Sequence, residues 1–241
     1  MLEKMEKFQL VILSVILAAG LIFATSLATG NLSKDVITVT GSSYKNVTSD
    51  SGRLEFRIMT RKPTKAIAYD TITKQIPQVK EFIKAKGFED SEIDIKAPNG
   101  YYTYKTLSNG YTTNEIEYYN ISQPMYVTSK DVQKIKELST ELPTLINKGI
   151  DIDAYNPQYF YSKLADDKVE MLGAATKDAK DRAASMLKAT NNRVGKIQSV
   201  KMGVFQITPV DSTNVSDMGI SDTSSIEKKI TSVANVTFRI K

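Results

Sequence analysis

The stretch KDAKDRAASMLKATNNRVGKIQSV at residues 177–200 is the most informative part of the sequence about the fold. Alanine, methionine and leucine recur there at helical spacing, and Gly195 then precedes an alternating segment. This pattern predicts the end of a long helix over about 163–191, followed by a strand at 196–208. Many of its apolar residues are small, which allows close packing. We expect its packed side to consist of Ala165, Val169, Leu172, Ala175, Ala179, Ala183, Met186 and Leu187.

Two further helices are expected before this one. Apolar residues recur at spacings of three and four over 64–87, which predicts a helix with one apolar side. Pro77 lies inside it and is expected to kink or split the helix, and Gly87 is suited to end it. A helix over 129–148 has an acidic residue, Asp131, in its first turn, where the helix dipole favours negative charge.

Alternating apolar and polar residues predict the strands. The segment VITVT at 36–40 is rich in β-branched residues, and the Gly-Ser-Ser at 41–43 is expected to end it. The segment RLEFRIMTR at 53–61 puts leucine, phenylalanine and isoleucine on one face, which is typical of a half-buried strand. The remaining strands are expected at 91–97, at 149–161 with an interruption near Pro157, and at 229–240.

A hairpin is expected around Asn109-Gly110, which separates a strand at 101–107 from one at 111–127. Residues 209–228 are rich in serine, aspartate and threonine and predict a flexible excursion. The order of elements favours an α+β fold. Mainly antiparallel sheets would pack with three helices in two similar halves, preceded by one N-terminal apolar helix.

Residues 8–29 contain no charged side chain, and a helix of that length would span about 33 Å, enough for a bilayer core. Lys4 and Lys7 precede the segment, as expected of a cytoplasmic flank. It fits either an uncleaved transmembrane anchor or a signal peptide cut after Ala28. The anchor is favoured, because the apolar cores of signal peptides usually span about 7–15 residues. Its membrane-facing side chains would include Phe8, Leu10, Ile12, Leu17, Leu21 and Phe23.

This interpretation divides the chain into residues 1–29, the anchor or signal peptide, and residues 30–241, an extracytoplasmic domain. With an uncleaved anchor the protein would be a single-pass protein of the cell membrane. After cleavage it would be secreted or periplasmic. A buried helix of a soluble domain is disfavoured, because the segment is apolar on every side.

The composition excludes several kinds of chemistry. The 241 residues include no cysteine, histidine or tryptophan. Disulfides, cysteine nucleophiles and histidine-based triads are therefore impossible, and so are thiolate and imidazole metal sites. No catalytic residue, bound metal or cofactor is expected. The net charge is +5, but the basic residues are spread along the chain, so we expect no nucleic-acid binding.

Tyrosine is concentrated in one part of the chain. Seven of the 12 tyrosines fall within 26 residues. Tyrosine is enriched in interfaces, so these side chains are candidates for contacts between copies of the chain. Packing between the strands of one hairpin and stacking on a glycan are the alternatives. The candidate interface residues are Tyr101, Tyr102, Tyr104, Tyr111, Tyr118, Tyr119 and Tyr126.

Acidic residues and serine–lysine pairs are further candidates for chemical sites. Asp151 and Asp153 would share one strand face, where their oxygens could hold a divalent cation, but no surrounding loop offers enough ligands, which favours a solvated face. Asp166-Asp167 lie in the first turn of a helix, where the dipole accounts for them. The trio Asp90, Glu92 and Asp94 forms a similar group. Neither Ser185 with Lys188 nor Ser129 with Lys130 lies beside a glycine-rich oxyanion loop.

Three segments together resemble the SIMPL-domain family, a bacterial extracytoplasmic group that includes the periplasmic immunogenic protein. They are VITVTGSS at 36–43, VTSKDVQKIKELSTELPTLINKGIDI at 127–152, and KDAKDRAASMLKAT running into VGKIQSV at 177–200. The resemblance covers about 36–240. It implies an α+β fold, a tendency to form large homo-oligomers, and a link to oxidative or envelope stress. It implies no catalytic motif.

The sequence therefore predicts a non-enzymatic, membrane-anchored protein that self-associates outside the cytoplasm into a large homo-oligomer. The alternatives are a monomeric or dimeric module that binds an envelope ligand or partner protein, and an enzyme that uses carboxylates or a serine–lysine pair.

Overall fold

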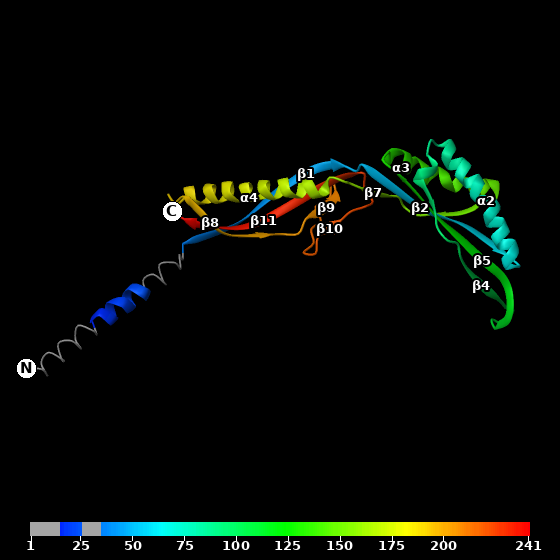
Figure 1. Ribbon diagram of the computed structural model, residues 1–241, viewed down its shortest axis with the longest axis horizontal. Helices are drawn as coiled ribbons and strands as arrows, with labels where there is room; N and C mark the ends of the chain where they lie inside the picture. Colours follow the sequence, from blue (N-terminus) through cyan, green and yellow to red (C-terminus); the bar gives the residue numbers. More distant parts are fainter. Residues whose placement is uncertain (1–14, 26–34) are drawn as a thin grey trace, which may run out of the picture. The chain divides into compact units, whose positions relative to one another are not determined.

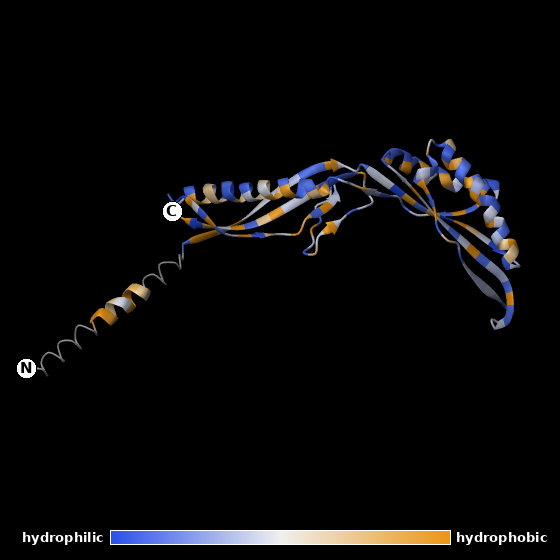
Figure 2. Ribbon diagram, viewed as in Figure 1, coloured by the Kyte–Doolittle hydropathy of each residue, from blue (hydrophilic) through white to orange (hydrophobic). Residues whose placement is uncertain are grey.

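The computed structural model describes residues 15–25 and 35–241 (Figure 1). Residues 15–25 are helical and almost entirely hydrophobic (Figure 2). Among the expected anchor residues, Leu17, Leu21 and Phe23 are exposed in this helix, whereas Phe8, Leu10 and Ile12 lie outside the described residues. Within the described ranges, no helix is long and apolar enough to cross a membrane.

The chain forms two compact units. The first contains the described residues up to 43, together with 172–203 and 232–241, and the second contains residues 44–171 and 204–231. The second unit includes a six-stranded sheet with β2 and β5 at its centre, covered by α2 and α3. Its elements are β2 (Ser51–Lys62), α2 (Lys65–Ala85), η1 (Asp90–Glu92), β3 (Ile93–Ile95), β4 (Asn99–Thr106), β5 (Thr112–Ser129), α3 (Val132–Glu141), η2 (Leu142–Lys148), β6 (Asp151–Ala154) and β7 (Gln158–Phe160).

A five-stranded sheet includes β1 and β11, which contribute residues to both units. Strand β11 pairs antiparallel with β8 and with β9, and β10 pairs parallel with β9. The elements are β1 (Val36–Thr48), α4 (Leu164–Lys188), β8 (Val194–Met202), β9 (Gln206–Pro209), β10 (Ile220–Ser221) and β11 (Glu227–Ile240). The α+β class, the antiparallel sheets, the helices α2, α3 and α4 and the preceding apolar helix are as predicted. The similarity of two halves stays a prediction.

The core of the six-stranded sheet follows from the alternation in β2. Leu54, Phe56 and Ile58 are fully buried, while the residues between them point to the opposite, partly exposed face. Antiparallel sheets commonly bury one face and leave the other to solvent. We call the second face the open face of the six-stranded sheet, because α2 and α3 pack on the other one.

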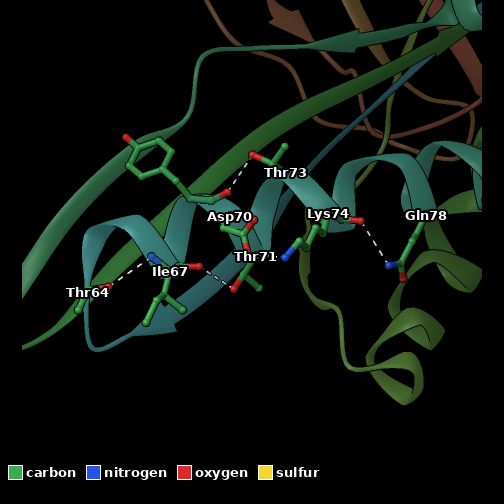
Figure 3. A network of polar contacts seen from close by, with 8 residues as sticks. Thr64, Ile67, Asp70, Thr71, Thr73, Lys74 and Gln78 are labelled. Carbon is green, nitrogen blue, oxygen red and sulfur yellow. Dashed lines mark hydrogen bonds and ion pairs between the residues drawn. The ribbon is translucent and has the colours of Figure 1, made fainter.

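Helix α2 is continuous across Pro77, so the expected split is wrong. Pro77 lies on the exposed side of the helix, where the carbonyl group that loses its partner remains accessible to water. Side-chain hydrogen bonds support the neighbouring turns (Figure 3): Thr64 caps the helix by accepting from Ile67 N, and Gln78 Nε2 donates to the Lys74 carbonyl. The helix ends before Gly87, as predicted, and that glycine has a φ of +84°.

Strand β1 continues to Thr48, so the expected end at residues 41–43 is wrong. Gly41 instead marks a close contact between strand β1 and helix α4. A Cβ atom on Gly41 would lie 2.1 Å from the Ala175 carbonyl oxygen and 2.3 Å from Ala179 N. Gly41 therefore lets the backbone of α4 approach the strand, and the next residue, Ser42, donates its N–H to Asp178 Oδ2 at 2.7 Å. This hydrogen bond lowers the pKa of Asp178.

The packed side of α4 differs from the predicted one. The buried residues recur at every fourth position, whereas Ala165, Val169 and Met186 are exposed. Val169 lies midway between buried Asp167 and buried Met171, two residues from each. Two residues correspond to a rotation of about 200° around a helix, so Val169 faces away from the buried side. The spacing of the small residues therefore determined the buried side, and the size of the apolar residues did not. The buried residues are Asp167, Met171, Ala175, Ala179, Ala183 and Leu187.

Three further boundaries differ from the predictions. The helix expected over 129–148 changes from α-helix to 3₁₀-helix at Leu142, next to Pro143. The strand expected at 196–208 is divided into β8 and β9. The excursion expected at 209–228 includes β10 and a buried ammonium group, Lys228 Nζ, which donates to the Asp222 carbonyl at 2.6 Å. Burial lowers the pKa of Lys228, and the charge of Asp222 opposes that shift.

Candidate functional site: the tyrosine-rich hairpin

The tyrosines lie on the hairpin formed by β4 and β5, whose turn is at Asn109-Gly110, as predicted. Gly110 has a φ of +85°, which glycine adopts without strain. Its N–H donates to the Leu107 carbonyl at 2.9 Å, and the Leu107 N–H donates to the Tyr111 carbonyl at 2.9 Å. Asn109 Oδ1 accepts from Tyr111 N at 3.1 Å. These bonds fix the register of the hairpin.

Strand β4 lies at an edge of the six-stranded sheet (Figure 1). It pairs with β5 from Asn99 to Thr106, and within the described residues no strand pairs with its other edge. An unpaired edge offers a row of N–H and C=O groups to another strand. The sequence of β4, NGYYTYKT, is rich in tyrosine and threonine, which favour strands, and contains one lysine.

Three of the tyrosines contact one another on the face of the sheet that bears the core. The ring of Tyr102 lies edge-on to Tyr104, with centroids 5.1 Å apart, and edge-on to Tyr119, at 6.4 Å. Tyr119 also packs against the hydrophobic core. A hydrogen bond with Tyr102 raises the pKa of Tyr104. Stacking of this kind stiffens the hairpin.

Two other tyrosines lie on the open face beneath arginine side chains. The Arg61 guanidinium lies 4.2 Å from the ring centroid of Tyr118, and Arg53 lies 4.2 Å from that of Tyr126. Tyr118 and Tyr119 thus point to opposite faces, as the alternation of a strand predicts. Arg61 is also held by a hydrogen bond from Nε to Asn120 Oδ1 at 3.3 Å.

The most exposed tyrosines of the hairpin are Tyr111 at the turn, at 71%, and Tyr101 on β4, at 69%. Tyr102 remains half exposed despite its ring contacts. The structure therefore places six of the tyrosines in the hairpin, divided between its two faces and its turn, whereas Tyr126 lies further along β5, opposite Asp94 of β3 and Glu55 of β2. Packing within the hairpin explains the position of Tyr119. It does not explain Tyr101 and Tyr111, because both side chains remain exposed.

The arginines were not predicted as part of this site. Arg53, Arg57 and Arg61 follow one another at every fourth residue of β2 and so share its open face. Arg57, which lies between the other two arginines on β2, is 5.0 Å from the ring centroid of Tyr155, on the segment that follows β6. This spacing was visible in the sequence, but the register that brings each arginine to a tyrosine depends on the pairing of β2 with β5.

The acidic residues form no metal site. Asp151 and Asp153 are exposed on β6, and within the described residues no group of three or more acidic side chains could hold a metal ion. Asp167 is buried, and hydrogen bonds stabilise its negative charge in addition to the helix dipole. It accepts hydrogen bonds from Lys45 Nζ at 2.7 Å and from the Tyr161 hydroxyl at 2.8 Å. These bonds lower the pKa of Asp167 and connect β1 to α4.

Asp90 has a structural role that titration can test. Lys80 Nζ lies 2.9 Å from its Oδ1, and Lys84 Nζ lies 2.8 Å from its Oδ2. The hydrogen bonds from Lys84 and Lys80 lower the pKa of Asp90 from 3.8 to about 2. Asp94, two residues beyond η1, pairs with Lys96. The carboxylates of Asp90 and Asp94 are therefore both paired with lysine side chains.

The Asp90→Asn variant should be less stable than the unsubstituted protein at neutral pH. A carboxylate whose pKa is lowered by folding stabilises the fold above its unfolded pKa, and the stabilisation is lost as the pH falls through the folded pKa. The difference in unfolding midpoint between the two proteins should therefore shrink as the pH falls from 3.8 to about 2. Carboxyl NMR of the unsubstituted protein would contradict this if Asp90 titrated at 3.8.

The two serine–lysine pairs lie on different elements. Ser185 and Lys188 are both exposed on α4. Ser129 is buried at the end of β5, where its hydroxyl accepts from Asp131 N at 3.4 Å, whereas Lys130 is exposed.

These features define an α+β protein with helix-covered antiparallel sheets and an exposed, tyrosine-rich edge hairpin. The model of the SIMPL family, described as a protein of unknown function (DUF541), matches residues 37–240. The chain belongs to the SIMPL family. No curated protein matches it.

Proposed function

We propose that this protein is a non-enzymatic, membrane-anchored SIMPL protein that self-associates outside the cytoplasm into a large homo-oligomer. The observation that carries the proposal is the unpaired edge of β4, flanked by exposed tyrosines. Natural proteins usually protect such an edge with charged residues, proline, a bulge or a covering element. The pairing of β4 with β5 is irregular beyond Thr103, where Lys105 also lies, so the regularly paired part, Asn99–Thr103, is the part offered to another strand. A role in envelope or oxidative stress rests on the family resemblance alone.

The hairpin is suited to bind another copy of the chain. Strand addition at β4 would satisfy its free backbone groups, and side chains from both faces would then contact the neighbour. Tyrosine and arginine are the residues most often found at the energetic centre of interfaces. Here Tyr118 and Arg61 are already stacked, so binding would cost little side-chain entropy.

The anchor is the second part of the proposal. Residues 8–29 are apolar over their whole length, and the part described, 15–25, is an exposed hydrophobic helix. Tethering copies to one membrane would raise their effective concentration and favour weak edge contacts.

A binding module for an envelope ligand is the second candidate, because the open face has a hollow beside the hairpin. Its volume is about 280 Å³, at the lower end for small-molecule sites. Within it, Ser122 Oγ is buried with no hydrogen-bond partner. The lining includes Met59, Arg61, Tyr101, Asn120, Ser122 and Asp151. Such a module would bind its ligand as a monomer or dimer.

Thiol labelling tests the β4 contact directly, because the chain has no cysteine of its own. Lys105 is exposed on β4, and a Lys105→Cys variant should react slowly with a water-soluble maleimide while the protein is assembled, because a neighbouring copy covers β4. Ser185→Cys, exposed on α4, is the matched control and should react rapidly. Equal reaction rates at the two positions would contradict assembly through β4.

Extraction with alkaline carbonate tests the anchor separately: the protein should stay with the membrane, and release into the supernatant would contradict the anchor.

A further inference from the structure

The first unit has a strongly basic end where the described chain enters it. Asp35 lies at this end, and its carbonyl oxygen accepts from Ile240 N at 2.9 Å. Arg193 and Lys241 are joined there by two backbone hydrogen bonds, at 2.7 and 2.8 Å. The end of α4, the start of β8 and the end of β11 therefore meet beside the start of β1 (Figure 1).

Five cationic side chains gather at this end. Segments 188–197 and 239–241 contain five basic residues and no acidic one. Lys188 and Arg193 line one surface hollow, of about 360 Å³, and the carbonyl of Arg239 lies close to Gly195, beside Lys196. We call this the basic end: Lys188, Arg193, Lys196, Arg239 and Lys241, all exposed.

One carboxylate, that of Asp35, lies at this end with the five cations, so the end keeps an excess of positive charge. Within the described residues, none of the five takes part in an ion pair, whereas the acidic residues further along α4, Asp178 and Asp181, are paired with Arg182 and Lys177. A cluster of unpaired exposed cations creates a positive potential that attracts an anionic surface. Ile197, which is half exposed on β8, adds an apolar side chain beside them.

We infer that the basic end docks on the surface of a bilayer that contains anionic phospholipid. The inference rests on the proposed anchor. Only residues 30–34 separate the anchor segment 8–29 from Asp35, and a chain of that length spans at most about 20 Å. The tether therefore holds the basic end near the headgroups, where its positive potential attracts anionic lipid of the outer leaflet.

The docked state orients the first unit. Contact through the basic end places the termini of β1, β8 and β11 at the membrane, in addition to the single tether. Because charges separated by more than a Debye length, about 8 Å at physiological salt, are largely screened, docking requires close contact and weakens as salt is added.

Fluorescence quenching in nanodiscs tests the inference on the full chain. The probe is a fluorophore on Ala189→Cys, an exposed position next to the basic end and the only thiol in that variant. Discs would contain phosphatidylcholine with a headgroup-bound nitroxide, with or without phosphatidylglycerol. Phosphatidylglycerol should increase quenching by about twofold or more, and about 0.5 M salt should remove the increase.

Charge reversal supplies the matched comparison. In the variant with Lys188, Arg193, Lys196 and Lys241 all changed to Glu, the effect of phosphatidylglycerol should be lost. In a control with Lys65, Lys130, Lys136 and Lys163, which are exposed in the second unit, changed to Glu, it should remain. If the charge-reversed variant does not fold, the salt series on the unsubstituted basic end still tests whether electrostatic attraction causes the docking.

The outcomes separate this inference from the proposed function. Incorporation into discs with equal quenching in both lipid compositions would overturn the docking surface and leave the anchor intact. Failure of the chain to co-elute with discs would overturn the anchor, and the inference with it.

Discussion

Chains carrying Tyr101→Lys together with Tyr111→Lys are expected to be monomers at concentrations where the unsubstituted protein is an oligomer. These are the two most exposed tyrosines of the hairpin. Tyrosines at the centre of an interface contribute about 2 kcal/mol or more each, so losing both should weaken association about a thousandfold. Lysine at a sheet edge also opposes pairing with another strand. Sedimentation velocity measures the effect.

The matched control changes two exposed side chains outside the hairpin. Tyr44 is 74% exposed on β1 and Val169 is 74% exposed on α4, so Tyr44→Lys with Val169→Lys adds the same charge without touching β4 or β5. This variant should keep the oligomer. Loss of the oligomer in the control, or its retention in the hairpin variant, would assign the contact to another surface.

Gly41→Ala should cause a large loss of stability. The added Cβ would meet backbone atoms of α4 at 2.1 and 2.3 Å, and the Ala179 Cβ at 2.7 Å. Backbone atoms cannot move aside as a flexible side chain can, so α4 would have to separate from β1. Overpacking typically costs 1–3 kcal/mol, and we expect about 3 kcal/mol or more here. Urea unfolding followed by circular dichroism gives the value.

Gly173→Ala, on the same helix, is the control for this prediction. No atom lies within 4 Å of the position that its Cβ would occupy. Alanine favours the middle of a helix over glycine by roughly 0.5–1 kcal/mol, so this variant should be slightly more stable. If both glycine variants changed stability alike, close packing at Gly41 would not be the cause.

The sequence predicted strand β2 and the hairpin of β4 and β5 well because their signals are local. The alternation of Leu54, Phe56 and Ile58 and the Asn109-Gly110 turn each determine structure within a few residues. The packing of α4 on β1 is different. Gly41 resembles a strand terminator in the sequence, and only the position of Ala175, more than a hundred residues later, shows that it is a contact point.

The candidate site was predicted in the same uneven way. The sequence identified the group of tyrosines and the turn at Asn109-Gly110. It did not show that β4 is an edge strand, because edge position depends on the pairing of the whole sheet. It also did not bring Arg61 to Tyr118 or Arg53 to Tyr126, since these contacts require the register between β2 and β5.

Self-association through the hairpin is the central proposal, and the mass of the purified full chain tests it most directly. Multi-angle light scattering in detergent, over a range of protein concentrations, would count the subunits. The proposal predicts one discrete species of many subunits whose mass does not change with concentration, and which the hairpin variant reduces to a single chain of 26.8 kDa. A single-chain mass for the unsubstituted protein at every concentration would contradict it.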